Sequence, residues 1–271
     1  MTNRERYRPF TNDASVRVRF DAAPLEFVLC QIRWPRLSAL QGDIRPIAEQ
    51  FGALLSDLPL YSETQEMSIE VTPAGIKQSP AGTVYQWNSA DRATGVSLTR
   101  DFVALTSKNY VGYDAFSGQL RDVLTALSSA VEIPLVERIG VRYLNRITDA
   151  DHLARIDQLV SPELLGHQAL TPATADVQIV QALTQSLFQV GSGYLQARSG
   201  VLAAGESIDP TVDPIGTQSW VLDIDSFHQQ EMVFGVESVL TEAGRLSDAA
   251  YDFFKLVIRQ GFIEAFEGRQ V

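Results

Sequence analysis

The chain has 271 residues, of which 45% are hydrophobic and 20% are charged, and its formal net charge at pH 7 is −11. Its length and apolar content allow a sizeable core, in one large domain or in two closely packed halves. The acidic balance argues against general nucleic-acid binding and against binding to an anionic membrane surface, because both usually need basic proteins.

The chain begins with a polar, basic segment, residues 1–20, which we expect to be a flexible arm that precedes the first half. Residues 24–34 form an almost continuous apolar run, typical of a central strand. An apolar stripe at helical spacing extends to Leu58 and predicts a helix that begins near Asp43, with Pro46 in its first turn.

The next region, residues 65–110, is predicted to be an antiparallel meander of short strands. Two PAG sequences, at Pro73 and Pro80, indicate turns within it. A helix is then predicted from Asp114 to Ala130, with Asp114 as its N-cap. The predicted strands are Met67–Thr72, Ile76–Gln78, Thr83–Asn88, Val96–Thr99 and Phe102–Ser107.

The segment Pro134–Thr148 has the clearest strand pattern in the chain. Alternate positions are apolar, and the opposite face carries three arginines. The apolar positions are Leu135, Ile139, Val141, Tyr143 and Ile147, and the arginines are Arg138, Arg142 and Arg146.

The second half then repeats the order of the first. A partly helical segment, 151–170, precedes strands at 177–190, 194–203 and 219–225, with a hairpin turn at Gly191–Gly193. A helical region at 233–266 closes the chain.

These elements predict an α+β fold, in which a curved antiparallel sheet carries its helices on one face. Residues 21–132 and 133–271 would be two pseudo-repeated β-α-β-β-β-α halves, packed as one globular unit. The outline is similar to the TATA-box-binding protein and to helix-grip ligand binders, a likeness of topology that transfers no function.

The sequence also resembles a sporadically distributed, functionally uncharacterised family of bacterial proteins. The resemblance is carried by APLEFVLCQIRW at Ala23, VYQW at Val84, the segment from Val96 to Phe116, IGVRYLNRI at Ile139 and VLDID at Val221. The family has no established catalytic residues. Its patchy distribution implies a link to mobile defence or toxin-associated genes.

The three arginines admit two interpretations. They could line a site for a phosphate or carboxylate, because guanidinium groups bind both in bidentate fashion. They could equally pair with acidic residues of neighbouring strands, such as Asp223 and Asp225, since buried arginines normally need partners. We therefore take the three arginines and both aspartates as candidate ligand-binding residues and favour the structural pairing.

Other chemistry is weakly indicated. Asp223 and Asp225 could bind a metal, but no histidine or third carboxylate nearby completes a site. The sequence contains no nucleophile, phosphate-loop or dinucleotide motif, so we predict no catalytic residue, no metal and no cofactor.

The segment from Lys108 to Phe116 offers candidate partner-binding residues. Asn109, Tyr110 and Tyr113 lie at a strand-to-helix junction, where they could contact a partner or clamp the start of the helix. We favour the second interpretation.

The functional hypothesis is a non-enzymatic binding or regulatory protein, plausibly in a bacterial defence or toxin-linked system. A protein partner or self-association is expected, because a large sheet leaves an edge to cover. The alternatives are a sensor of a small anion and a metal-dependent hydrolase or nuclease. The single cysteine, Cys30, and the absence of a long apolar run indicate a cytoplasmic protein that does not bind membranes.

Overall fold

A computed structural model describes residues 6–13, 17–72, 75–170, 174, 176–208 and 212–270, without the side chains of 66–81. The strands are β1 (Val18–Phe20), β2 (Leu25–Arg33), β3 (Leu60–Thr72), β4 (Gly75–Asn88), β5 (Thr94–Leu98), β6 (Phe102–Ser107), β7 (Leu135–Val136), β8 (Arg138–Ile147), β9 (Ala182–Val190), β10 (Gly193–Leu202), β11 (Ser219–His228), β12 (Met232–Val233) and β13 (Gly268–Gln270). The α-helices are α1 (Arg45–Gly52), α2 (Tyr113–Ala130), α3 (Ala150–Ala154), α4 (Ile156–Leu159), α5 (Val236–Val257) and α6 (Gln260–Ala265). Short 3₁₀ helices are η1 (Ser38–Leu40), η2 (Pro162–Leu164) and η3 (Gly166–Ala169).

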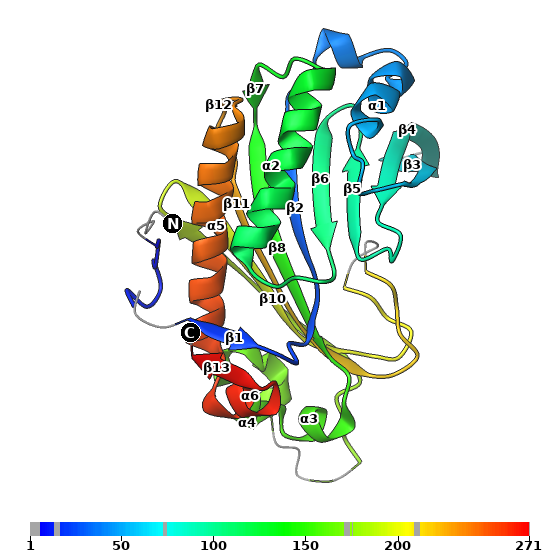
Figure 1. The fold of residues 1–271 in the computed structure, drawn as a ribbon. Coiled ribbons are helices and arrows are strands. Elements are labelled where there is room, and N and C mark those ends of the chain that lie inside the picture. Colours follow the sequence, from blue (N-terminus) through cyan, green and yellow to red (C-terminus); the bar gives the residue numbers. More distant parts are fainter. Residues whose placement is uncertain are drawn as a thin grey trace. The chain divides into compact units, whose positions relative to one another are not determined.

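The fold is α+β, as predicted. Nine strands form one open antiparallel sheet in the order β3-β4-β5-β6-β2-β8-β11-β10-β9, with the helices on one side (Figure 1). The first strands of the two predicted halves, β2 and β8, are neighbours in this order. In each half the last strand of the sheet, β6 or β11, lies next to the first one, and the earlier strands follow toward the edge. Four strands, β3 to β6, follow α1, whereas the β-α-β-β-β-α plan has three at this place and the prediction along the chain has five.

Contacts divide the chain into two compact units that each combine separate segments. Unit 1 contains residues 1–27, 142–227 and 245–271, and unit 2 contains residues 28–141 and 228–244. The predicted division at residue 132 and the packing as a single unit stay predictions.

In unit 2, α2 forms much as predicted, but its N-cap differs. Its apolar stripe is buried, with Phe116, Leu120 and Leu124 at most 2% exposed. The N-cap is Gly112, whose φ of 148° suits glycine, and Asp114 lies in the first turn. The prediction of Asp114 as N-cap was therefore wrong, because the glycine lets the helix begin one residue earlier.

The meander also differs from prediction, because two long strands replace the first three short ones. β3 and β4 pair from Leu60 to Thr72, with a register shift between Glu66 and Met67. Pro80 lies within β4 opposite that irregularity, so the turn predicted there was wrong: a bulge accommodates the proline instead. Of the turn predicted at Pro73–Gly75, residues 73 and 74 lie outside the described residues.

β8 is extended and has the predicted alternation. Its residues Ile139, Val141 and Ile147 are at most 2% exposed, and the Tyr143 hydroxyl lies 2.7 Å from Ser247 Oγ on α5. The face that carries Tyr143 is therefore the helix side of the sheet. The opposite face, which carries the even-numbered residues, holds Arg142 and Arg146.

The core of unit 1 lies between that helix side and α5, α4 and α6. Trp220, Leu222 and Ile224 of β11 pack there with Phe253 of α5 and Phe262 of α6. The long helix predicted at 233–266 ends at Val257, because the next residues pair elsewhere: Ile258 bridges to Val160, and the Arg259 N–H donates to the Leu159 carbonyl.

Two buried aspartates of α5 hold the N-terminal segment 6–13 against unit 1. The Asp252 carboxylate accepts the N–H groups of Phe10 and Thr11 at 2.7 and 3.0 Å. Asp248 accepts the N–H of Tyr7 and lies 3.6 Å from the Arg8 guanidinium. The segment predicted as a flexible arm thus makes specific contacts over these residues, and its last part, β1, pairs with β13.

Candidate functional site

The three arginines of β8 are too far apart to hold one small ligand together. They follow each other at intervals of four residues, which is about 13 Å along a strand. Arg138 belongs to unit 2, where its Nη1 lies 3.5 Å from Gln31 Oε1. Arg142 and Arg146 belong to unit 1, so the site is built from these two and their neighbours.

Asp223 is the acidic partner of Arg142. Arg142 Nε donates to Asp223 Oδ1 at 2.7 Å, and its Nη2 donates to Oδ2 at 3.1 Å. This bidentate geometry is the strongest form of a guanidinium–carboxylate pair. Because the Asp223 side chain is only 2% exposed, the pair is nearly desolvated. The structural pairing of Arg142 is therefore present.

A second arginine, Arg198 of β10, binds the same carboxylate. Arg198 lies directly opposite Asp223 in the β10–β11 pairing. Its Nε and Nη2 both donate to Asp223 Oδ2, at 2.9 and 2.5 Å. One carboxylate thus lies between two guanidinium groups. The sequence analysis missed Arg198, because only the strand register brings it to Asp223.

The connection between β10 and β11 folds over this face of the sheet. The loop closes on itself through a hydrogen bond from the Gly205 N–H to the Ile215 carbonyl. Arg198 Nη1 donates to the Ile208 carbonyl at 3.4 Å, and Arg146 Nη1 donates to the Asp213 carbonyl at 2.9 Å. Both arginines therefore hold the described part of this loop, 203–208 and 212–218, against the strands.

Arg146 keeps two N–H groups without a partner. The residue is 6% exposed, and neither its Nε nor its Nη2 has a hydrogen-bond partner among the described residues. An unpaired buried donor costs about 1–3 kcal/mol, and more when the group is charged. Nε and one Nη are also the pair of donors with which a guanidinium binds a carboxylate or phosphate in bidentate fashion.

We call Arg142, Arg146, Arg198 and Asp223 the arginine cluster. The side chains of Arg142 and Arg198 are 13% and 23% exposed, so solvent reaches the cluster. The Arg142 Cζ atom lies over the ring of Phe27, 5.6 Å from the ring centroid, which is the geometry of a cation–π contact. The unpaired donors of Arg146 give the cluster the chemistry of an anion site.

The aspartate pair does not have the arrangement of a metal site. Both oxygens of Asp223 already accept hydrogen bonds from guanidinium groups. Asp225 lies on the same face of β11 and pairs in register with Gln196. In the part of the chain that the structure describes, no three His, Cys, Asp or Glu side chains gather as a metal would require.

Two of the three candidate partner-binding residues pack at the start of α2. Tyr113 is 7% exposed and its hydroxyl lies 3.5 Å from the Leu240 carbonyl oxygen. The Tyr110 ring meets the Phe116 ring edge-on at 6.1 Å. Asn109 is exposed. These contacts support the clamping interpretation for both tyrosines and leave partner binding by Asn109 a prediction.

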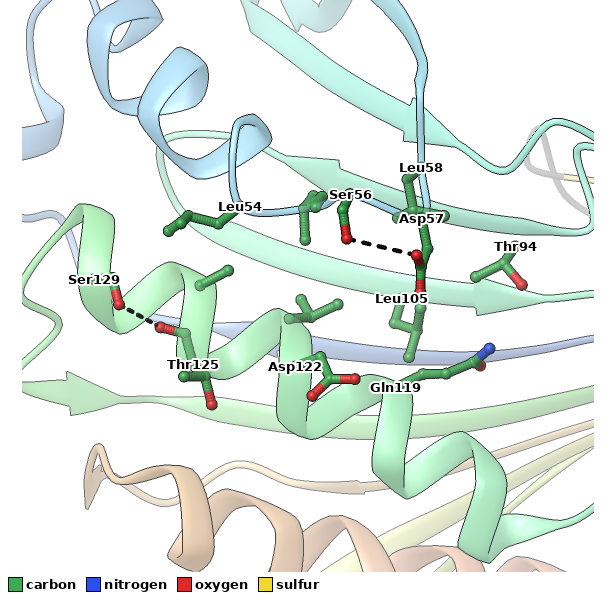
Figure 2. A pocket seen from close by; sticks show the side chains of 13 residues that line it. Leu54, Ser56, Asp57, Leu58, Thr94, Leu105, Gln119, Asp122, Thr125 and Ser129 are labelled. Atoms are coloured by element: carbon green, nitrogen blue, oxygen red, sulfur yellow. Dashed lines mark hydrogen bonds between the residues drawn. The ribbon is translucent and has the colours of Figure 1, made fainter.

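Unit 2 contains a separate pocket of about 370 Å³ (Figure 2). Its floor is apolar, with buried Leu55, Leu58 and Leu105, and carboxylates of Asp57 and Asp122 lie among its polar lining. No basic side chain lines it, so this pocket would repel the anions that the arginine cluster would attract. It lies between α2 and the connection from α1 to β3, and the sequence analysis did not indicate it.

Comparison with known proteins adds no assignment: neither a family model nor a curated protein matches the chain. The resemblance to an uncharacterised bacterial family therefore stays a prediction. Within the described residues, none of the helices is both long and apolar enough to cross a membrane.

Proposed function

We propose that the protein is a non-enzymatic binding protein that takes a small anion, a phosphate or a carboxylate, at the arginine cluster. The observation that carries the proposal is the pair of unpaired donors on buried Arg146. An anion with two oxygens would satisfy Nε and Nη2 together and remove the cost of leaving them unpaired.

The surroundings of Arg146 support an anion rather than a cation or a neutral ligand. Arg146 is itself a cation, and the two donors left over on it can meet only an acceptor. The anion would also contact the loop that Arg146 and Arg198 already hold through the carbonyls of Asp213 and Ile208. Ligand binding would thereby stabilise the loop, which is how such a site could pass a signal to a partner.

A thermal-shift screen tests the proposal. The protein is heated with inorganic phosphate, nucleotides, and di- and tricarboxylic acids, each over a concentration series. A ligand that binds only the folded state at 100 times its Kd adds about 2.7 kcal/mol of stability. For a chain of this size that is a rise in Tm of about 5–10 °C.

Two matched variants make the screen specific. Arg146→Met removes the donors and the charge but keeps the apolar stem, so it should abolish the shift. Arg155→Met, at an exposed position of the same unit, should leave the shift unchanged. Absence of any shift in the wild type, or a shift that survives Arg146→Met, would contradict the proposal.

The wider role stays part of the proposal. A regulatory component of a bacterial defence or toxin-linked system is what the family resemblance implies, and a protein partner would read the state of the loop. The genes that neighbour this one, and proteins that co-purify with it from its host, test that context directly.

A further inference from the structure

β9 is the last strand of the sheet. The helix η3 packs beside Thr184 near its start, but no strand in the described part of the chain pairs with the outer edge of residues 185–189. In an antiparallel pair, alternate residues bond to one neighbour while the others direct their N–H and C=O groups away from it. A two-residue turn with Gly191 at φ 60° joins β9 to β10, so Val190 and Gly193 form the closing pair. Gln185, Leu187 and Gln189 therefore point their backbone groups outward, and none of these groups has a backbone partner among the described residues.

The side chains of β9 do not protect this edge. Natural edge strands are usually blunted by charged residues, proline or a bulge. β9 has none of these, and every residue from 185 to 189 is exposed, with Leu187 at 61% and Phe188 at 37%. The nine residues of the strand therefore form a regular and uncharged edge, with Leu187 and Phe188 exposed at its centre.

The opposite end of the sheet shows the contrast. β3 carries Glu63, which forms an ion pair with Arg45 and accepts a hydrogen bond from the Tyr61 hydroxyl at 2.6 Å. These hydrogen bonds, the one from Tyr61 first, lower the pKa of Glu63, so the carboxylate stays charged on that edge. A charged side chain on an edge strand opposes pairing with another chain, whereas β9 lacks one.

We infer that β9 pairs with β9 of a second copy of this chain, antiparallel and about a two-fold axis at Leu187. The exposed run is symmetric about that residue: Leu187 would face its own copy, and Gln185 would face the copy's glutamine at position 189. Two-fold pairing of identical strands satisfies every outward donor with an equivalent acceptor.

The absence of charge on β9 permits contact with a second copy. Each chain carries a net charge of −11, so two copies repel each other wherever charged surfaces meet. Residues 177–197 contain no charged side chain, so the contact would join the two copies through an uncharged segment. A basic partner, by contrast, would find no carboxylate on β9 to recognise.

Sedimentation velocity on the full chain, from 1 to 100 µM, tests the inference. The wild type should be a dimer that dissociates on dilution. Leu187→Lys should be a monomer, because it places two like charges opposite each other at the axis. Gln185→Pro should also be a monomer, because it removes an outward N–H while leaving the bonds to β10 intact. Ser62→Lys, the same charge added to β3, should remain a dimer.

A mixed-charge experiment shows whether Leu187→Lys is monomeric because like charges meet at the axis or because the substitution weakens dimerisation in some other way. Leu187→Lys and Leu187→Glu should each be monomeric alone, and an equimolar mixture should restore the dimer, because opposite charges then meet at the axis. Circular dichroism and thermal unfolding check that each variant is folded. A monomeric wild type at 100 µM, or a dimer that persists in both Leu187→Lys and Gln185→Pro, would overturn the inference.

Discussion

Removal of the Asp223 carboxylate should destabilise unit 1 more than most single substitutions. In Asp223→Asn, one amide oxygen remains as an acceptor, but the amide nitrogen presents a donor to a guanidinium. Arg142 and Arg198 then lose the charge that lies between them, in a site where Asp223 is 2% exposed. Breaking a buried ion pair by removing one partner costs about 3–5 kcal/mol.

Thermal unfolding measures this cost. A loss of about 3–5 kcal/mol corresponds to a fall in Tm of roughly 6–20 °C for a chain of this length. The control is the triple variant Asp223→Leu, Arg142→Met, Arg198→Met, which removes all three charges. Because apolar replacement of a whole buried ion network is often neutral or stabilising, this variant should recover at least half of the lost stability. A loss below about 1 kcal/mol in Asp223→Asn, or no recovery in the triple variant, would refute the reasoning.

Three further predictions concern other parts of the fold. Gly200→Ala should lower the free energy of unfolding, measured with a chemical denaturant, by at least about 2 kcal/mol. The φ of Gly200 is 143°, and a Cβ there would lie 2.0 Å from a backbone oxygen of β9. The control Gly216→Ala, with open space around it, should change this free energy little. Asp252→Ala should release the N-terminal segment and make the bond after Phe10 sensitive to brief chymotrypsin treatment, which the wild type should resist. Desolvation and a hydrogen bond to an adjacent carboxylate raise the pKa of Tyr61 to about 12, so ultraviolet titration of the wild type should contain a tyrosine step above pH 10 that is missing in Tyr61→Phe. The stability that this group contributes should be complete below pH 10 and be lost as the pH rises toward 12, and Tyr61→Phe should reduce that dependence.

The elements with strong periodicity were predictable from the sequence. β8 and α2 each bury a regular apolar face, with a period of two residues in β8 and of about 3.6 in α2, so local pattern and final packing agree. The hairpin turn at Gly191 was predictable for a similar reason, since glycine supplies the positive φ that such a turn requires. The sequence alone predicts an element when its local pattern and its tertiary packing favour the same structure.

Boundaries that depend on a distant partner were not predictable. The strand predicted at 177–190 begins only at Ala182, because its partner β10 ends at Leu202 and leaves the earlier residues nothing to pair with. The last helix is interrupted after Val257 because the chain there pairs with Val160. Both features are tertiary, and neither leaves a local signal.

Part of the candidate site was predictable from the sequence, and part depended on tertiary structure. Arg142, Arg146 and Asp223 were identified from alternation on their own strands. Arg198 joins them only through the β10–β11 register, and the loop that covers Arg146 does so through its backbone carbonyls, which carry no sequence signature. The sequence therefore indicated the charges but not which of them remain unpaired.

The most direct test of the anion site is a crystal structure of the protein soaked in selenate, whose selenium gives an anomalous signal. The proposal predicts an anomalous peak with selenate oxygens within about 3 Å of both Arg146 Nε and Nη2, and its loss in Arg146→Met. Protein or water oxygens on both nitrogens, with no selenate at Arg146, would contradict it.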